Sequence, residues 1–203
     1  MSLMQKLIIK GRKELTGTIS ISGSKNATLP ILAASILTKN TKLTNVPFVK
    51  DIFTMLELLK FIGIRIKINR KKKSIDLKNS RKSINTLAPY KLVKTMRAGV
   101  LVLGPLLTKY KKAKVSLPGG CAIGTRPVDL HLLALKKLGA TIKIKDGYII
   151  AEAKYGLKGT KIKFPSISVG ATENALLAAH GATGKTILIN CAIEPEIIDL
   201  IKF

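Results

Sequence analysis

Cysteine, aromatic residues and acidic residues are all scarce in this chain of 203 residues. Its two cysteines, Cys121 and Cys191, are too few for a disulfide framework and have no neighbours at metal-ligand spacing. Tryptophan is absent and aromatic residues make up 4% of the sequence, too little for an evident surface on which nucleic-acid bases could stack. The histidines, His131 and His180, also lie apart from acidic or cysteine partners, so we expect no metal site.

Long apolar runs are missing as well. The longest, 98–107, contains Gly104 and Pro105 and falls far short of the roughly 20 residues that a membrane-spanning helix needs. The N-terminus shows no apolar stretch before a small-residue cleavage site, so we predict no secretory signal. Hydrophobic residues nevertheless make up 46% of the chain, enough to build a sizeable core. We therefore expect a folded, cytoplasmic protein without membrane insertion.

Acidic residues are the scarcest relative to their counterparts: the chain has 36 lysines and arginines but 11 acidic residues, which gives a formal net charge of +25. Such a surplus raises nucleic acid as a partner. Only six of the basic residues are arginine, however, and the lysines are spread along the whole chain. Lysine together with abundant isoleucine and asparagine is also the bias of an AT-rich genome. We favour solvated lysines without a nucleic-acid partner and keep a nucleic-acid-binding module as the alternative.

One pattern recurs along the chain: a helix of small apolar residues, a short strand, a loop, a second helix, a glycine and another strand. In the first copy we expect these elements at 27–37, 42–46, 51–62 and 64–68, and in the second at 96–107, 113–117, 128–138 and 140–144. The segments LLKFIGIRIKI (58–68) and ALKKLGATIKI (134–144) align without a gap. Copies of this kind pack into one domain of helices against sheets, so we predict an α/β fold.

The third copy is incomplete. Its helix at 172–179, strand at 185–190 and helix at 194–203 are present, but the closing glycine and strand are not. Gly63 and Gly139 occupy the expected helix C-cap in the first two copies. A copy that stops early leaves an apolar helix face and a sheet edge without partners. The repeat therefore predicts a fragment of a longer protein.

The segment LPGGCAIGTRPVDLH (117–131) is the richest in chemistry. Its glycines and prolines predict a loop before the helix that starts near Pro127. A cysteine between glycines is accessible, and nearby cations such as Arg126 favour its thiolate, so Cys121 is a candidate nucleophile or general acid. An ordinary buried thiol is the alternative for Cys121. For Cys191 we expect a place in the core.

Two further places suit an anionic ligand. The turn SGSKN (22–26) precedes a helix, whose N-terminal N–H groups and dipole attract anions, and Lys25 could neutralise a phosphate or carboxylate there. Ser24 or Asn26 as a simple N-cap is the alternative. Arg97 and Arg126 stand out in a chain that uses lysine almost everywhere, because a guanidinium binds phosphate or carboxylate through two parallel hydrogen bonds. Chance surface arginines remain the alternative for both.

Five segments together carry a family resemblance: SGSKNATLPILAASIL, APYKLVKTMRAG, SLPGGCAIGTRPVDLHLLALKKLGATI, ISVGATENALLAA and EPEIIDL. They resemble the UDP-N-acetylglucosamine 1-carboxyvinyltransferases, a branch of the enolpyruvyl transferases, from about residue 7 to residue 203. The resemblance implies an inside-out α/β barrel domain built from repeated βαβαββ units, here with the third unit truncated. It assigns residues 1–22 to the first strand of a second domain, and 23–203 to an incomplete N-terminal catalytic domain with copies at about 23–80, 90–153 and 158–203.

The resemblance also implies a reaction and its residues. The 3′-hydroxyl of UDP-N-acetylglucosamine adds to C2 of phosphoenolpyruvate while C3 takes a proton, and the resulting ketal expels phosphate, which commits the sugar to peptidoglycan synthesis. Cys121 matches the family's general acid, which is also the residue that fosfomycin alkylates. The family uses no metal or other cofactor. The positions that match its substrate-binding residues are Lys25, Asn26, Arg97, Arg126, Pro127, Val128, Asp129, Leu130, Ser166, Ile167, Ser168 and Val169. The family often has a basic residue at the position of Ser166.

Three expectations follow for the chain as it stands. Half of the family's active-site cleft is absent, so we expect this polypeptide alone to bind the sugar nucleotide weakly and to turn over nothing. A separate C-terminal half could complete it in trans. The alternatives are a non-catalytic relic of a split or decaying gene and the basic nucleic-acid-binding module named above.

Overall fold

The computed structural model describes residues 7–12, 14–79, 84–94, 96–119 and 128–203. The first copy of the repeat comprises α1 (Lys25–Ala34), β1 (Asn40–Leu43), α2 (Lys50–Ile62), β2 (Arg65–Asn69) and β3 (Ser74–Lys78). The second comprises β4 (Leu87–Ala88), α3 (Tyr90–Val93), the 3-10 helix η1 (Arg97–Val102), α4 (Leu103–Tyr110), β5 (Lys112–Ser116), α5 (Asp129–Lys137), β6 (Thr141–Lys145) and β7 (Tyr148–Glu152). The third comprises β8 (Lys161–Lys163), α6 (Val169–Ala179), β9 (Ile187–Ile189) and α7 (Pro195–Lys202).

Strand pairing follows the same pattern in successive copies. The described residues form sheets with the orders β1-β3-β2, β4-β5-β7-β6 and β8-β9. The strand after the first helix of a copy pairs antiparallel with the last strand of that copy, as β1 with β3 and β5 with β7. The strand that opens the second and third copies pairs parallel, as β4 with β5 and β8 with β9. The α/β fold class predicted from the sequence is therefore confirmed.

Helix α2 shows why the sequence pattern works. Its buried residues Ile52, Met55, Leu56 and Leu59 follow the spacing of one helix face. Gly63 then ends the helix with a left-handed φ of 118°, and its N–H donates to the carbonyls of Leu59 and Lys60. A left-handed residue is the ordinary end of a helix, and glycine adopts it without steric cost. The expected C-cap at this position is confirmed.

Two expected elements differ from the structure. The helix expected at 96–107 is a 3-10 helix followed by an α-helix, because a side chain of α6 interrupts its hydrogen-bond ladder, as described below. The strand expected at 42–46 begins and ends earlier, since the left-handed φ of 54° at Asn45 turns the chain out of the sheet. The pattern taken from the residues alone lacks β3 and β7, the second strand of each hairpin, which the βαβαββ unit implied by the resemblance includes.

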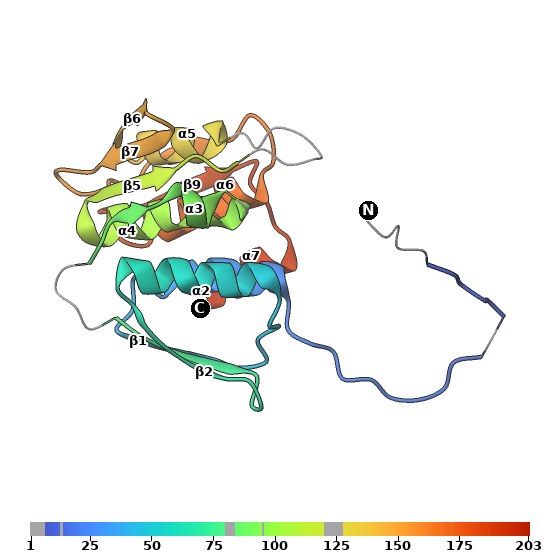
Figure 1. Cartoon of the computed structure of the whole chain (residues 1–203). Coiled ribbons are helices and arrows are strands. Elements are labelled where there is room, and N and C mark those ends of the chain that lie inside the picture. Colours follow the sequence, from blue (N-terminus) through green and yellow to red (C-terminus); the bar gives the residue numbers. More distant parts are fainter. Residues whose placement is uncertain (1–6, 13, 80–83, 95, 120–127) are drawn as a thin grey trace.

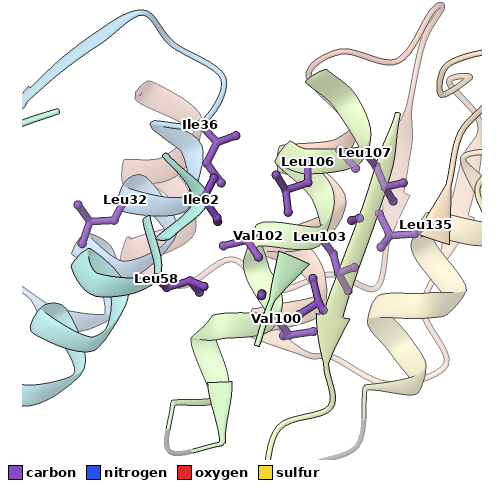
Figure 2. Packing of buried hydrophobic residues seen from close by; sticks show 14 of the residues in the cluster. Leu32, Ile36, Leu58, Ile62, Val100, Val102, Leu103, Leu106, Leu107 and Leu135 are labelled. Carbon is purple, nitrogen blue, oxygen red and sulfur yellow. The ribbon is translucent and has the colours of Figure 1, made fainter. Parts of the chain in front are cut away.

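Helices α2 and α4 lie between β1 and β2 on one side and β5, β6 and β7 on the other, and α5 lies next to β6 and β7 (Figure 1). One continuous hydrophobic cluster joins all three copies. Figure 2 shows Ile36 and Ile62 from the first copy on one side of Val102 and Leu106, and Leu135 from α5 on the other side. Cys191, for which a core position was expected, is half-buried and packs against the edge of this cluster. None of the helices in the described ranges is long and apolar enough to cross a bilayer.

Before α1, the described residues 7–12 and 14–23 form neither helix nor strand. This segment runs away from the rest of the molecule (Figure 1). Its large apolar side chains are exposed, namely Leu7, Ile8, Ile9, Leu15, Ile19 and Ile21. Apolar side chains that alternate in this way, as at Ile19 and Ile21, are typical of a strand with one buried face.

Helices α4 and α6 approach so closely that Gly104 has no room for a side chain. A Cβ at Gly104 would lie 2.6 Å from Asn174 Oδ1 and 2.7 Å from the Asn174 carbonyl oxygen. We expect Gly104→Ala to lower the free energy of unfolding by about 2–3 kcal/mol, because backbone must shift to admit the methyl group. Urea unfolding measures this change. Gly11→Ala is the control, since a Cβ there meets nothing within 4 Å, and equal stability of the two variants would contradict the prediction.

Candidate functional site

A cleft of about 530 Å³ opens where the three copies meet. Its walls come from the N-terminus of α1, the start of η1, the first turn of α5, the segment that leads into α6, and the N-terminus of α7. The polar and charged side chains that line it are Lys25, Asn26, Asp51, Arg97, His131, Ser168, Glu173 and Glu196. The cleft thus brings together residues as far apart in the sequence as Lys25 and Glu196, 171 positions.

Six of the predicted site residues line this cleft, namely Lys25, Asn26, Arg97, Ile167, Ser168 and Val169. Four others, Val128, Asp129, Leu130 and Ser166, are described but are not among its lining residues. Cys121, Arg126 and Pro127 lie outside the described residues. The structure therefore brings together the α1, η1 and α6 parts of the predicted site.

The N-terminus of α1 is capped as the sequence allows. Ser24 is the N-cap, and its Oγ accepts a hydrogen bond of 3.2 Å from the backbone N–H of Ala27. Lys25 Nζ forms an ion pair of 3.0 Å with Asp51 Oδ2, and both side chains are substantially exposed. An exposed pair of this kind contributes little stability, so an incoming anion can compete for the lysine at small cost.

The start of α6 repeats this arrangement. Ser168 is its N-cap, and its Oγ accepts a hydrogen bond of 3.3 Å from the N–H of Ala171. Two helix N-termini, α1 and α6, thus border one cleft together with Arg97. Helix N-termini and guanidinium groups attract phosphate and carboxylate oxygens. The arrangement suits a ligand with several anionic groups.

Glu173 is a cleft residue that sequence reasoning missed. It lies one turn into α6 and is only 6% exposed. Burial and, next, the carboxylate of Glu196 raise its pKa to about 8, with Arg97 acting in the opposite direction and Glu194 in the same one. Glu173 is therefore mostly uncharged at neutral pH. The sequence signal that could have identified Glu173 is that it is the single carboxylate in the helix VGATENALLAA, whose other residues are mostly small and apolar.

His131, in the first turns of α5, is also missing from the predicted site residues. It is 2% exposed, and burial followed by the neighbouring Arg97 lowers its pKa to about 4, against a raising effect of Asp129. The imidazole is consequently neutral at physiological pH. No group of three or more histidine, cysteine or acidic side chains in the described part of the chain is arranged to hold a metal ion.

The family profile of EPSP synthase (3-phosphoshikimate 1-carboxyvinyltransferase) matches residues 9–203. The chain belongs to this family. The carboxyvinyltransferase fold is also that of two solved structures. The enolpyruvyl transferase NikO from Streptomyces tendae has a TM-score of 0.80 at 20% identity over 95% of this chain and 45% of its own. EPSP synthase from Acinetobacter baumannii has a TM-score of 0.73 at 18% identity, and the match covers 93% of this chain and 44% of that protein.

Within this family, the chain is similar to curated proteins of one name. UDP-N-acetylglucosamine 1-carboxyvinyltransferase of Pelagibacter ubique is 62% identical over 98% of this chain and 48% of the relative. The protein of the same name from Rickettsia akari is 58% identical over 97% of this chain and 47% of the relative. The chain spans about half the length of these curated relatives. The enolpyruvyl transferase fold expected from the sequence is confirmed.

The raised pKa of Glu173 predicts a pH dependence of stability. Below its ordinary pKa of 4.5 this carboxyl is protonated in the folded and unfolded chain alike. Between 4.5 and about 8 only the folded chain keeps the proton, so the carboxyl destabilises the fold increasingly as pH rises through this window. Glu173→Gln removes the titration, and we expect it to raise the free energy of unfolding by roughly 4 kcal/mol at pH 8 and by less than about 0.5 kcal/mol at pH 4.5.

Urea unfolding across this pH range tests the prediction. Glu57→Gln, at an exposed glutamate paired with Lys60, is the control. Parallel stability curves for the native chain and Glu173→Gln would show that Glu173 titrates normally.

Proposed function

We propose that this chain is the N-terminal half of an enzyme that transfers the enolpyruvyl group from phosphoenolpyruvate to the 3′-hydroxyl of UDP-N-acetylglucosamine. The observation that carries the proposal is the cleft, in which Lys25, Arg97 and two helix N-termini converge. Both substrates are polyanions, and together they carry a carboxylate, a phosphate and a diphosphate. The high identity to relatives named for this reaction supports the choice of substrates.

The proposed chemistry balances as an addition followed by an elimination. The sugar oxygen bonds to C2 of phosphoenolpyruvate while C3 takes a proton and the hydroxyl loses one. The ketal then breaks its C–O bond to phosphate and loses a proton from C3, which restores the double bond. Cys121 is proposed as the general acid that protonates C3, in keeping with the loop position and cationic neighbours that the sequence gives it. No redox step or external oxidant is required.

Charge in the cleft fits these roles. Lys25 and Arg97 place positive charge on the walls of the cleft, where it can stabilise the negative charge of a transition state. Glu173 would oppose anion binding if it were ionised, but its raised pKa keeps it mostly neutral at pH 7. Asn26, Ile167, Ser168 and Val169 are proposed to contact substrate from the same walls. Arg126, Pro127, Val128, Asp129, Leu130 and Ser166 are proposed as further substrate contacts on the family resemblance alone.

The domain organisation belongs to the same proposal. Residues 23–203 would form an incomplete catalytic domain, and residues 1–22 would contribute a strand to a second domain. The exposed apolar side chains of the described N-terminal segment, such as Ile19 and Ile21, support a partner for it. Because the second domain's half of the cleft is absent from this chain, residues 1–203 alone should bind the sugar nucleotide weakly and release no phosphate from the two substrates. Turnover by the purified chain at the rate of an intact enolpyruvyl transferase would contradict this.

Binding of UDP-N-acetylglucosamine tests the proposed site directly. We expect Arg97→Ala to weaken binding at least tenfold, because a charge-assisted hydrogen bond contributes about 1.5–3 kcal/mol. Arg97→Lys should fall in between, since an ammonium keeps the charge and loses the paired geometry. Isothermal titration of residues 1–203 gives the dissociation constants. Lys60→Ala on the outer surface is the control, and equal weakening by both alanine variants would point to a general charge effect instead of this site.

A further inference from the structure

Asn174 is the most extensively bonded side chain of the described core. It lies in the middle of α6 and is 0% exposed. Its Oδ1 accepts a hydrogen bond of 2.8 Å from the N–H of Gly104. Its Nδ2 donates one of 3.1 Å to the carbonyl of Val100 and makes a second contact of 3.2 Å with His131 Nδ1. One amide therefore joins α6 to η1, α4 and α5.

This amide takes the place of a helical hydrogen bond. In a continuous α-helix the N–H of Gly104 would donate to the carbonyl of Val100, four residues earlier. Here the Asn174 amide bonds to both groups, and the Val100 carbonyl also accepts a hydrogen bond from the N–H of Leu103. The chain changes from the 3-10 helix η1 to the α-helix α4 at this position. The amide thus sets the pitch of the segment that begins with Arg97.

The same bonds fix the protonation of His131. A backbone N–H can only donate and a carbonyl can only accept, so Gly104 and Val100 permit one orientation of the Asn174 amide. The Asn174 nitrogen must then donate to His131 Nδ1, which leaves Nδ1 without a proton. Because the imidazole is neutral, its proton is on Nε2. Nε2 is buried and has no hydrogen-bond partner among the described residues.

The imidazole in turn holds the entrance of α6. A Cβ on Gly170 would lie 3.1 Å from His131 Cε1 and 3.3 Å from Nε2, so the ring packs directly against the backbone of Gly170. Gly170 follows Ser168 and Val169, which line the cleft. Asn174 consequently connects, through hydrogen bonds and one packed ring, the wall that carries Arg97 and the wall that carries Ser168.

We propose that Asn174 is a positioning residue of the sugar-nucleotide cleft: its amide holds His131 as the Nε2–H tautomer and fixes η1, α5 and the start of α6 at the spacing that the ligand requires. The inference rests on the proposed function, because it takes UDP-N-acetylglucosamine as the ligand. Asn174 itself does not line the cleft and acts through its neighbours.

The native chain provides the first test. ¹⁵N NMR of the imidazole should show a protonated Nε2 and an unprotonated Nδ1 for His131 at pH 7. Saturating UDP-N-acetylglucosamine should shift the signals of the His131 ring and the Gly170 amide. An Nδ1–H tautomer would overturn the inference. So would ligand binding that leaves both sets of signals unchanged.

Asn174→Asp provides the second test, because it keeps the size of the side chain and replaces the donor nitrogen with an acceptor oxygen. A carboxylate cannot donate to His131 Nδ1, so the ring must place a proton on Nδ1 and either lose the one on Nε2 or become cationic. We expect the dissociation constant for UDP-N-acetylglucosamine to rise at least tenfold, together with a protonated Nδ1. Asn79→Asp is the matched control, since Asn79 is also buried and donates to the Ile36 carbonyl at 2.7 Å, away from the cleft.

The possible outcomes distinguish the role of Asn174 from the proposed function of the chain. Weaker binding in Asn174→Asp and less than a twofold change in Asn79→Asp supports the inference. Equal losses of affinity in both variants, or an unchanged affinity in Asn174→Asp, overturns it and leaves the proposed function standing. Absence of any binding by the native chain overturns both. If Asn174→Asp does not fold, the native NMR measurement decides alone.

Discussion

The close approach of α4 and α6 is the constraint on which the rest of this structure depends. These helices come from different copies of the repeat, and they meet where Gly104 has no side chain and Asn174 reaches across. A larger residue at Gly104 would separate the two helices. Because the interior is close-packed, that separation would propagate to the sheets on either side. The contact therefore holds the second and third copies together and also places the starts of η1 and α6 on one cleft.

Charge within the cleft is balanced locally, although the chain as a whole is strongly basic. Lys25 and Arg97 share the cleft with Asp51, Glu173 and Glu196. Burial keeps Glu173 mostly uncharged near neutral pH, so Lys25 and Arg97 share the cleft with two other acidic side chains and the lining charges balance.

Much of this arrangement could be predicted from the sequence, because it depends on local signals. The repeat, the helix ends at Gly63 and Gly139, and the cleft residues in SGSKN all follow from periodicity and capping. The break between η1 and α4 could not be predicted, since it depends on Asn174, some 70 residues away. Glu173 and His131 were missed for the same reason. Their pKa values depend on burial and on charges brought from other copies.

The central claim is that these residues form the catalytic half of an enolpyruvyl transferase, and the reactivity of Cys121 tests it most directly. The measurement is peptide mass spectrometry of residues 1–203 treated with fosfomycin, with and without UDP-N-acetylglucosamine, and with Cys191 as the internal comparison. The account predicts a saturable adduct on Cys121 that forms faster when the sugar nucleotide is present, and little on Cys191. Equal labelling of both cysteines, or labelling that ignores the sugar nucleotide, would contradict it.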